Sequence, residues 1–292
     1  MRIQWQAWSG IPKQQSKQVT YQQVRSQALV PRAVLLFDID GVIRDVAGSY
    51  RRAIVDTVHH YSGQRPEPAT IDALKTEGVW NNDWLASREL LRRAGLGQEG
   101  QPPLPALLDI VDVFNDFYFG GDPEGDPACW SGFIGDEPLL VDSGFFDALD
   151  EAGIAWGFVS GAEPPSARYV LQQRLGLSDP PLIAMGDAPD KPDPTGLLTL
   201  ARQLAGPLGA EAPPVAYLGD TVADVQTVVQ ARQQLPEQRF LALAVAPPHL
   251  QASGNEQRRH RYEEHLRQAG ADAVIAATDQ VLRCLEQVLQ AV

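Results

Sequence analysis

Six short, mostly apolar runs, separated by stretches with helical periodicity, constrain the fold of this chain more than any other feature. Runs of this kind fit strands that are buried on both faces of a parallel sheet. They are Ala33–Phe37, Ile154–Val159, Pro181–Met185, Val215–Leu218, Phe240–Val245 and Ala273–Ala276. Helical patterns lie between them, at Pro165–Leu175, Thr195–Leu204, Ala223–Leu235, Glu256–Ala269 and Thr278–Gln290. Because strands that alternate with helices build βαβ units, the sequence predicts an α/β fold with a parallel sheet and helices on both faces.

One long segment interrupts this alternation. Between Tyr50 and about residue 138 we find no convincing buried strand, and four stretches have helical patterns instead. They are Tyr50–Tyr61, Pro68–Glu77, Asn82–Ala94 and Leu104–Phe119. We therefore expect a core domain of residues 31–48 and 136–292, with a helical domain of residues 49–135 inserted after the first strand. Residues 1–30 form a separate N-terminal extension.

The composition excludes several classes of function. Acidic residues outnumber basic ones by 37 to 24, which gives a net charge of -13. Because such a chain repels phosphate backbones, we expect no nucleic-acid partner. No apolar run approaches the roughly 18 residues that a membrane-spanning helix needs, so we expect no membrane partner. The two cysteines, Cys129 and Cys284, form no disulfide framework, which favours a reducing, cytoplasmic location.

Polar side chains gather where the predicted strands end. The residues at these ends, or in the loops just beyond them, are Asp38, Asp40, Ser160, Lys191, Asp220 and Asp224. In open α/β sheets, ligands bind at the carboxyl ends of the strands. Four carboxylates in one place repel each other unless a cation joins them, and an all-oxygen set suits Mg²⁺ above all.

The order of these residues resembles the four motifs of the haloacid dehalogenase-like (HAD) hydrolase superfamily. The matching segments are Phe37–Asp45, Phe158–Gly161, Lys191–Pro194 and Gly219–Asp224. The resemblance covers about residues 33–250 and implies a Rossmann-like core. The place of the helical insert resembles that of the C1 cap of subfamily IA. More narrowly, residues 40–52 and 80–84 resemble a small IA group found in cyanobacteria and some archaea.

The resemblance implies a Mg²⁺-dependent phosphatase that acts on a small-molecule phosphate monoester. Asp38 would attack phosphorus and form an aspartyl-phosphate. Asp40 would protonate the leaving oxygen and then deprotonate the hydrolytic water. Ser160 and Gly161 would hold the phosphoryl group through a hydroxyl and a backbone N–H, and Lys191 would stabilise its charge.

The same resemblance implies the metal ligands. The Asp38 carboxylate, the Asp40 backbone carbonyl and Asp220 would bind Mg²⁺. Asp224 would bind through water or would orient Lys191.

Two further residues are candidates for substrate binding. Arg44, just after the first motif, could reach an anionic group of the substrate. Asn81 belongs to a cluster of tryptophans and asparagines in the predicted cap that could hold a polar or ring-bearing group. Sugar phosphates, phosphoglycolate and amino-alcohol phosphates such as histidinol phosphate all remain candidate substrates.

Two alternative functions stay open. The first motif also resembles that of β-phosphoglucomutase, but those mutases carry a histidine where this chain has Tyr50. A catalytically silent protein that only binds a phosphometabolite is the other alternative, although such a protein would have no need of the acid Asp40. Dehalogenases of the superfamily lack that second acid, so phosphoryl chemistry is favoured over dehalogenation.

Overall fold

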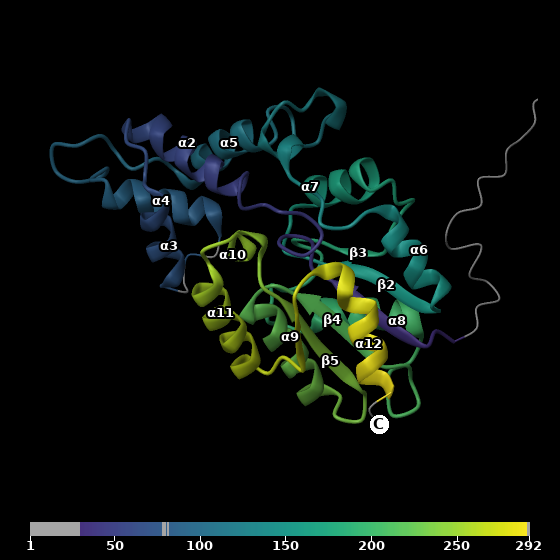
Figure 1. Cartoon of the computed structure of the whole chain (residues 1–292). Helices are drawn as coiled ribbons and strands as arrows, with labels where there is room; N and C mark the ends of the chain where they lie inside the picture. The colour runs from purple at the N-terminus through teal and green to yellow at the C-terminus, as the bar shows by residue number, and fades with distance from the viewer. Residues whose placement is uncertain (1–29, 78–79, 81, 291–292) are drawn as a thin grey trace, which may run out of the picture.

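The computed structural model of the chain describes residues 30–77, 80 and 82–290 (Figure 1). Within these residues, parallel strands form one six-stranded sheet with the order β3-β2-β1-β4-β5-β6. The strands are β1 (Ala33–Phe37), β2 (Ile154–Val159), β3 (Leu182–Ile183), β4 (Val215–Gly219), β5 (Phe240–Val245) and β6 (Ala273–Ile275). The predicted α/β fold with a parallel sheet is therefore confirmed, and β1, β2 and β5 have the predicted bounds.

The strand β3 differs most from its prediction. The apolar run Pro181–Met185 predicts a longer strand, but only Leu182 and Ile183 pair with β2. Because β3 lies at the edge of the sheet, it has a neighbour on one side only. Met185 instead forms an isolated bridge in the turn that follows.

The strand order reverses at β1. From β1 the chain runs outward through β2 and β3, and it then crosses to the other side of β1 for β4, β5 and β6. Ligands of open α/β sheets bind outside the carboxyl ends of strands at such a reversal. The reversal brings together the loops that follow β1, β2 and β4.

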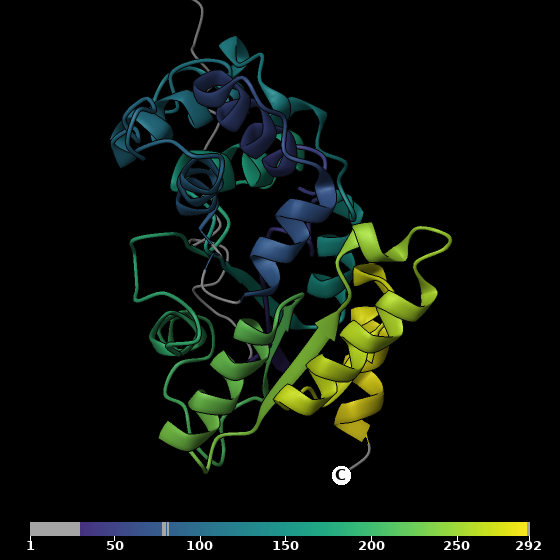
Figure 2. The ribbon, with the colours of Figure 1, turned by 90° about the vertical axis from the view of Figure 1, so that its left-hand side faces the viewer.

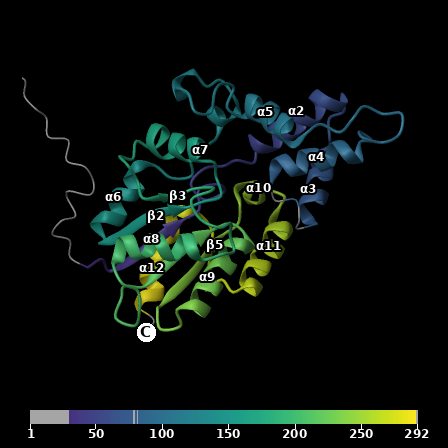
Figure 3. The same cartoon turned by 180° about the vertical axis from the view of Figure 1, so that it is seen from behind.

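Helices cover both faces of the sheet. One face packs against α6 (Ser143–Glu151), α7 (Pro164–Arg168), the π-helical segment Tyr169–Arg174 and α12 (Val281–Gln290), the last of which lies in front of the strands in Figure 1. The other face packs against α8 (Thr195–Ala205), α9 (Val222–Gln234) and α11 (Glu256–Ala269), seen from behind in Figure 3. Successive side chains of a strand point to opposite faces, so a continuous apolar run fills both cores.

Two core helices depart from the predicted pattern. The predicted helix Pro165–Leu175 is α-helical only as far as Arg168 and then continues as the π-helical segment. No helix was predicted where α6 lies. Its signal was the N-cap, since the Asp142 carboxylate accepts a hydrogen bond from the Phe145 N–H just before a short apolar pattern.

The segment between β1 and β2 is helical, as predicted. Its helices are α2 (Tyr50–Ser62), α3 (Pro68–Thr76), α4 (Asp83–Arg93) and α5 (Leu107–Tyr118), followed by the 3₁₀ turns Pro127–Cys129 and Phe133–Asp136. The helix α5 begins three residues later than Leu104, with Ala106 as its N-cap, and Pro105 disfavours helical geometry at Leu104 itself. A third hydrophobic core forms among these helices, and all of its fully buried members lie between Ala53 and Ile134.

These helices lie over the carboxyl ends of the strands, which Figure 2 shows from the side. Among the helices that the structure describes, none has the length and apolar character needed to cross a bilayer. The short helix α10 (Pro248–Gln251) follows β5 and faces the helical insert. The predicted N-terminal extension lies outside the described residues, apart from residue 30.

Candidate active site

The carboxyl ends of β1, β2 and β4 bring the predicted site residues together. Asp38 follows β1, Ser160 follows β2 and Asp220 follows β4, and these three strands are neighbours. Carboxylate oxygens of Asp38, Asp220 and Asp224 lie within 4.8 Å of one another. The sequence predicted this convergence because polar residues that directly follow parallel strands all lie at the same end of the sheet, beside the carboxyl ends of the strands.

Lys191 joins two of these carboxylates. Its Nζ lies 2.8 Å from Asp38 Oδ2 and 2.5 Å from Asp224 Oδ1. The Nζ also donates to the Tyr217 hydroxyl at 3.1 Å, and that hydroxyl donates to the Val159 carbonyl at 2.7 Å. We call Asp38, Lys191, Asp220 and Asp224 the strand-end cluster.

Tyr217 is a site residue that sequence reasoning missed. It lies within β4 and is buried, so the sequence shows only an aromatic residue in an apolar run. Buried tyrosine hydroxyls nearly always have a hydrogen-bond partner, which is the signal that could have marked it. Its hydroxyl lies 3.1 Å from Asp224 Oδ1, so it helps to fix both Lys191 and Asp224.

The start of α9 holds Asp224 in place. Thr221 is the N-cap of α9 and forms a capping box with Asp224. Asp224 Oδ2 accepts hydrogen bonds from the Thr221 N–H at 2.9 Å and from its hydroxyl at 2.6 Å. Both oxygens of Asp224 are therefore engaged, one by the cap and one by Lys191.

Burial and neighbouring charges shift the pKa values of the strand-end cluster. Burial raises the pKa of Asp38 to about 6, although Lys191 acts against the rise. Burial also raises the pKa of Asp220 well above its usual range, and the Asp224 and Asp38 carboxylates add to this rise. Burial favours a higher pKa for Asp224 as well, but Lys191 and Thr221 hold it below its usual value. One lysine therefore leaves this cluster short of positive charge.

The donor set fits a hard divalent cation. Three carboxylates supply only oxygen atoms, which are the ligands that Mg²⁺ prefers in proteins. Gly41 has a left-handed φ of 75°, and a Cβ at this position would lie 2.2 Å from Asp220 Oδ2. The glycine thus allows the backbone after β1 to approach the Asp220 carboxylate. A cation here would supply the positive charge that Lys191 alone does not.

Asp40 belongs to a second group of charges, in which Arg44 and Glu137 are buried and Asp40 itself is half-buried. Arg44 Nε donates to Asp40 Oδ1 at 2.7 Å, and Arg44 Nη1 donates to Glu137 Oε2 at 2.9 Å. The Arg44 side chain has no exposed surface. We call Asp40, Arg44 and Glu137 the junction cluster, because Glu137 lies where the chain returns from the helical insert to the core.

The junction cluster changes the interpretation of Arg44. From its place after the first motif, Arg44 was a candidate to reach an anionic substrate group, but in the structure its guanidinium donates to protein groups. Beyond the two carboxylates, its Nη2 donates to the Ser166 hydroxyl at 2.8 Å. A substrate contact for Arg44 stays a prediction that this arrangement does not favour. Glu137 and Ser166 lie 93 and 122 residues from Arg44 in the chain, so no local pattern indicated them.

The other predicted substrate residues lie as follows. Ser160 is buried, and its hydroxyl accepts a hydrogen bond from the Ala162 N–H at 3.1 Å. Gly161 is exposed in the turn between them. Asn81 lies outside the described residues. Its neighbour Asn82 caps α4, since its side chain accepts from the Leu85 N–H at 3.0 Å.

The family of the chain follows from a match that covers more than half of its residues. The sequence model of the haloacid dehalogenase-like hydrolases matches residues 33–232. This chain belongs to the haloacid dehalogenase-like hydrolases. The predicted family is therefore confirmed, while the narrower cyanobacterial and archaeal group stays a prediction.

Individual relatives of this hydrolase extend the comparison. A curated protein of Phytophthora nicotianae named imidazoleglycerol-phosphate dehydratase is 32% identical over 197 residues, which is 67% of this chain. The match spans only 40% of the length of that relative.

Two solved structures share the fold. The phosphonoacetaldehyde hydrolase like protein from Oleispira antarctica has a TM-score of 0.62 and 19% identity over 89% of this chain and 93% of that one. Phosphatase Tt82 from Thermococcus thioreducens has a TM-score of 0.54 and 22% identity over 80% of this chain and 98% of that one.

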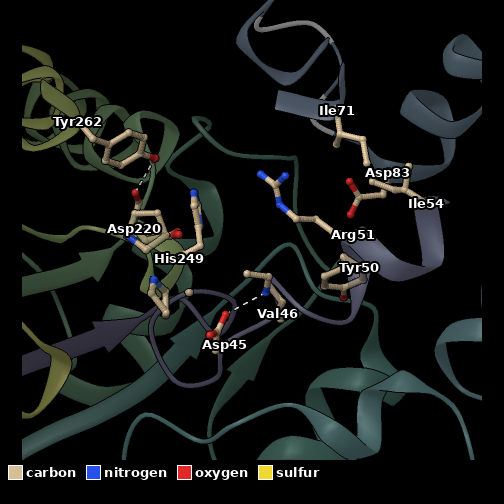
Figure 4. A pocket seen from close by; sticks show the side chains of 14 residues that line it. Asp45, Val46, Tyr50, Arg51, Ile54, Ile71, Asp83, Asp220, His249 and Tyr262 are labelled. Atoms are coloured by element: carbon tan, nitrogen blue, oxygen red, sulfur yellow. Dashed lines mark hydrogen bonds between the residues drawn. The ribbon is translucent and has the colours of Figure 1, made fainter. Parts of the chain in front are cut away.

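In this haloacid dehalogenase-like hydrolase, a cavity of about 250 Å³ separates the strand-end cluster from the helical insert. Asp220, His249 and Tyr262 line it from the core, and Arg51 and Asp83 line it from the insert (Figure 4). Figure 4 shows the Arg51 side chain extending from α2 into the cavity. The cavity therefore offers acidic, basic and aromatic groups next to the strand-end cluster.

Proposed function

We propose that this chain is a Mg²⁺-dependent phosphatase that hydrolyses a small phosphate monoester through an aspartyl-phosphate on Asp38. The observation that carries the proposal is Lys191, which bridges Asp38 and Asp224 beside Asp220 at the strand ends. A nucleophilic carboxylate must approach a phosphoryl group of like charge. Positive charge beside that carboxylate is therefore the main requirement for phosphoryl transfer.

The residues divide the chemistry between them. Asp38 attacks phosphorus, and the bond from phosphorus to the leaving oxygen breaks. Asp40 gives its proton to that oxygen and then takes a proton from the water that hydrolyses the aspartyl-phosphate. Lys191 and the Ser160 hydroxyl stabilise the phosphoryl oxygens, together with the Gly161 N–H.

The metal site is part of the same proposal. The Asp38 carboxylate, the Asp40 carbonyl and Asp220 would hold Mg²⁺, which supplies charge stabilisation for the phosphoryl group. For Asp224 the two earlier possibilities were a water-mediated metal contact and the orientation of Lys191. The engagement of both Asp224 oxygens by Thr221 and Lys191 supports the second role.

The helical insert of residues 49–135 is proposed to act as the cap that selects the substrate. The cavity beneath it carries Asp83, Arg51 and His249, which suit a leaving group with polar or ionised substituents. The Phytophthora nicotianae relative is named for imidazoleglycerol phosphate, so esters with an imidazole ring belong among the candidates. Sugar phosphates, phosphoglycolate and histidinol phosphate complete the set.

The test is phosphate release from this panel of esters, measured with Mg²⁺ and with EDTA. We expect release from one ester that is strongest with Mg²⁺ and is lost with EDTA. No release from any ester would contradict the phosphatase. In that case, conversion of one sugar phosphate isomer into another would indicate the mutase, and phosphate binding without turnover would indicate a silent binding protein.

A further inference from the structure

We infer that Arg44 is a positioning residue that orients the carboxyl group of Asp40, and that Glu137 holds Arg44 for this task. The inference rests on the proposed function, since Asp40 is the proton donor there. It assigns a role to a buried arginine and a buried glutamate that the proposed chemistry does not use.

The hydrogen bonds of Arg44 run in three directions. Its Nε–H meets one oxygen of Asp40, Oδ1, at 2.7 Å. Its other nitrogens donate to Glu137 at 2.9 Å and to Ser166 at 2.8 Å. Glu137 and Ser166 therefore fix the orientation of the planar guanidinium independently of Asp40.

Glu137 is itself held in place by burial and by hydrogen bonds to both of its carboxylate oxygens. It has 2% of its surface exposed. Its Oε1 accepts hydrogen bonds from the Ser49 hydroxyl and from the Tyr118 hydroxyl, the latter at 3.1 Å, while Oε2 accepts from Arg44. The Tyr118 hydroxyl also lies 3.1 Å from the Ser166 hydroxyl. The support of Arg44 thus joins the core helix α7 to α5 of the insert.

Arg44, held in this way, restricts the orientation of the Asp40 carboxyl group. The Asp40 side chain keeps 27% of its surface exposed, whereas that of Arg44 keeps none. A half-buried aspartate without such support can take other orientations, and each misplaced orientation lowers the rate of proton transfer. Because Arg44 occupies Oδ1, the other oxygen of Asp40 is the one left to carry the proton to the leaving group.

The experiment uses two esters that differ in their need for a proton. An alkyl phosphate has a poor leaving group that must be protonated, whereas 4-nitrophenyl phosphate releases a stable anion. We expect Arg44→Gln to lower kcat/KM for the alkyl ester about 10²-fold or more, in the range of general acid catalysis. For 4-nitrophenyl phosphate we expect a loss of no more than about threefold. If Arg44 has only a structural role, its substitution lowers kcat/KM equally for the two esters.

Three further variants complete the design. Glu137→Gln keeps an acceptor for Arg44 and is expected to show the same preference with a smaller loss, which provides a second test if Arg44→Gln does not fold. Arg44→Lys is expected to recover part of the alkyl activity through its single donor group. Arg52→Gln is the matched control, since Arg52 forms an exposed pair with Asp136 at 3.2 Å and does not touch the junction cluster.

The reference variant is Asp40→Asn. If Asp40→Asn lowers kcat/KM selectively for the alkyl ester and Arg44→Gln lowers kcat/KM equally for both esters, the inference is overturned and the proposed function stands. If Asp40→Asn itself lowers kcat/KM equally for both esters, the proposed role of Asp40 as the acid for the leaving group fails, and the positioning role fails with it. Selective loss in both variants supports the inference.

Discussion

The strand-end cluster and the junction cluster satisfy their acids in different ways. In the strand-end cluster, Lys191 faces three carboxylates whose oxygens lie within 4.8 Å of one another. In the junction cluster, Arg44 lies between two carboxylates, and hydroxyl groups complete the environment of Glu137. Burial raises the pKa of Glu137 to about 7, although Arg44 acts against the rise. A proton can therefore balance the junction cluster near neutral pH.

The difference separates carboxylates that need a further cation from a buried Arg44–Glu137 pair that the protein itself satisfies. The strand-end cluster has too little positive charge for its carboxylates, so it favours a cation or a substrate complex that brings one. In the junction cluster, Arg44 and Glu137 have protein partners for their hydrogen bonds, which is how buried polar groups persist in a stable fold. The expected role of these two residues is therefore geometric. The predictions below test this contrast.

The largest effect is expected for Asp38→Asn, which removes the nucleophile. Turnover should fall by roughly 10⁴-fold or more, because no other residue can form the covalent intermediate. Steady-state phosphate release measures the effect. The matched control is Asp147→Asn, an exposed aspartate of α6, which should keep the wild-type rate. Comparable loss in both variants would contradict the assignment of Asp38.

Lys191→Met should destabilise the fold, because it leaves Asp38 and Asp224 buried without their shared cation. Removing one partner of a buried ion pair costs about 3–5 kcal/mol. Urea unfolding without Mg²⁺ measures the loss. The surface pair provides the comparison: Arg52→Met removes a partner that is 52% exposed, and it should cost under about 1 kcal/mol. A loss for Lys191→Met as small as that for Arg52→Met would remove the contrast between the two kinds of pair.

Glu137→Gln should change how stability depends on pH. The folded-state pKa of Glu137 is about 7, above its ordinary value of 4.5. The folded state therefore binds the Glu137 proton more tightly than the unfolded state does. This proton binding stabilises the fold fully below pH 4.5, and the stabilisation is lost as pH rises through about 7. A difference of this size corresponds to about 3 kcal/mol.

Thermal unfolding between pH 4 and 8 measures this contribution. The wild-type protein should lose stability over that range more steeply than Glu137→Gln, because the amide cannot titrate. Parallel profiles for the two proteins would show that Glu137 does not carry a proton in the junction cluster.

Mg²⁺ should stabilise the protein through its proposed ligands Asp38, Asp220 and the Asp40 carbonyl. At 100 times the dissociation constant, a ligand that binds only the folded state contributes about 2.7 kcal/mol. The rise in Tm on adding MgCl₂ should be smaller in Asp220→Asn, which lacks one proposed ligand. Glu137→Gln should keep the full rise because Glu137 belongs to the other cluster. An unchanged rise in Asp220→Asn would contradict the proposed metal site.

Much of the fold and of the strand-end cluster could be predicted because their signals are local. An apolar run such as Ala33–Phe37 marks a strand by itself, and the polar residue that follows it, Asp38, marks where that strand ends. The Asp224 environment is equally local, since a threonine three residues before it forms a capping box. Helix ends were less predictable, as the π-helical turn after Arg168 shows.

The sequence by itself determined the alternation of strands and helices, the insert between the first two strands, and the residues at the strand ends. Only the tertiary structure decided the partners of Arg44 and the role of Tyr217. An arginine just after a motif looks exposed in the sequence, because burial depends on residues that lie far along the chain. Glu137, which lies 93 residues away, pairs with Arg44 only because the chain returns from the insert beside its point of departure. Periodicity encodes which face of an element is buried, but it does not encode which distant charge that face will meet.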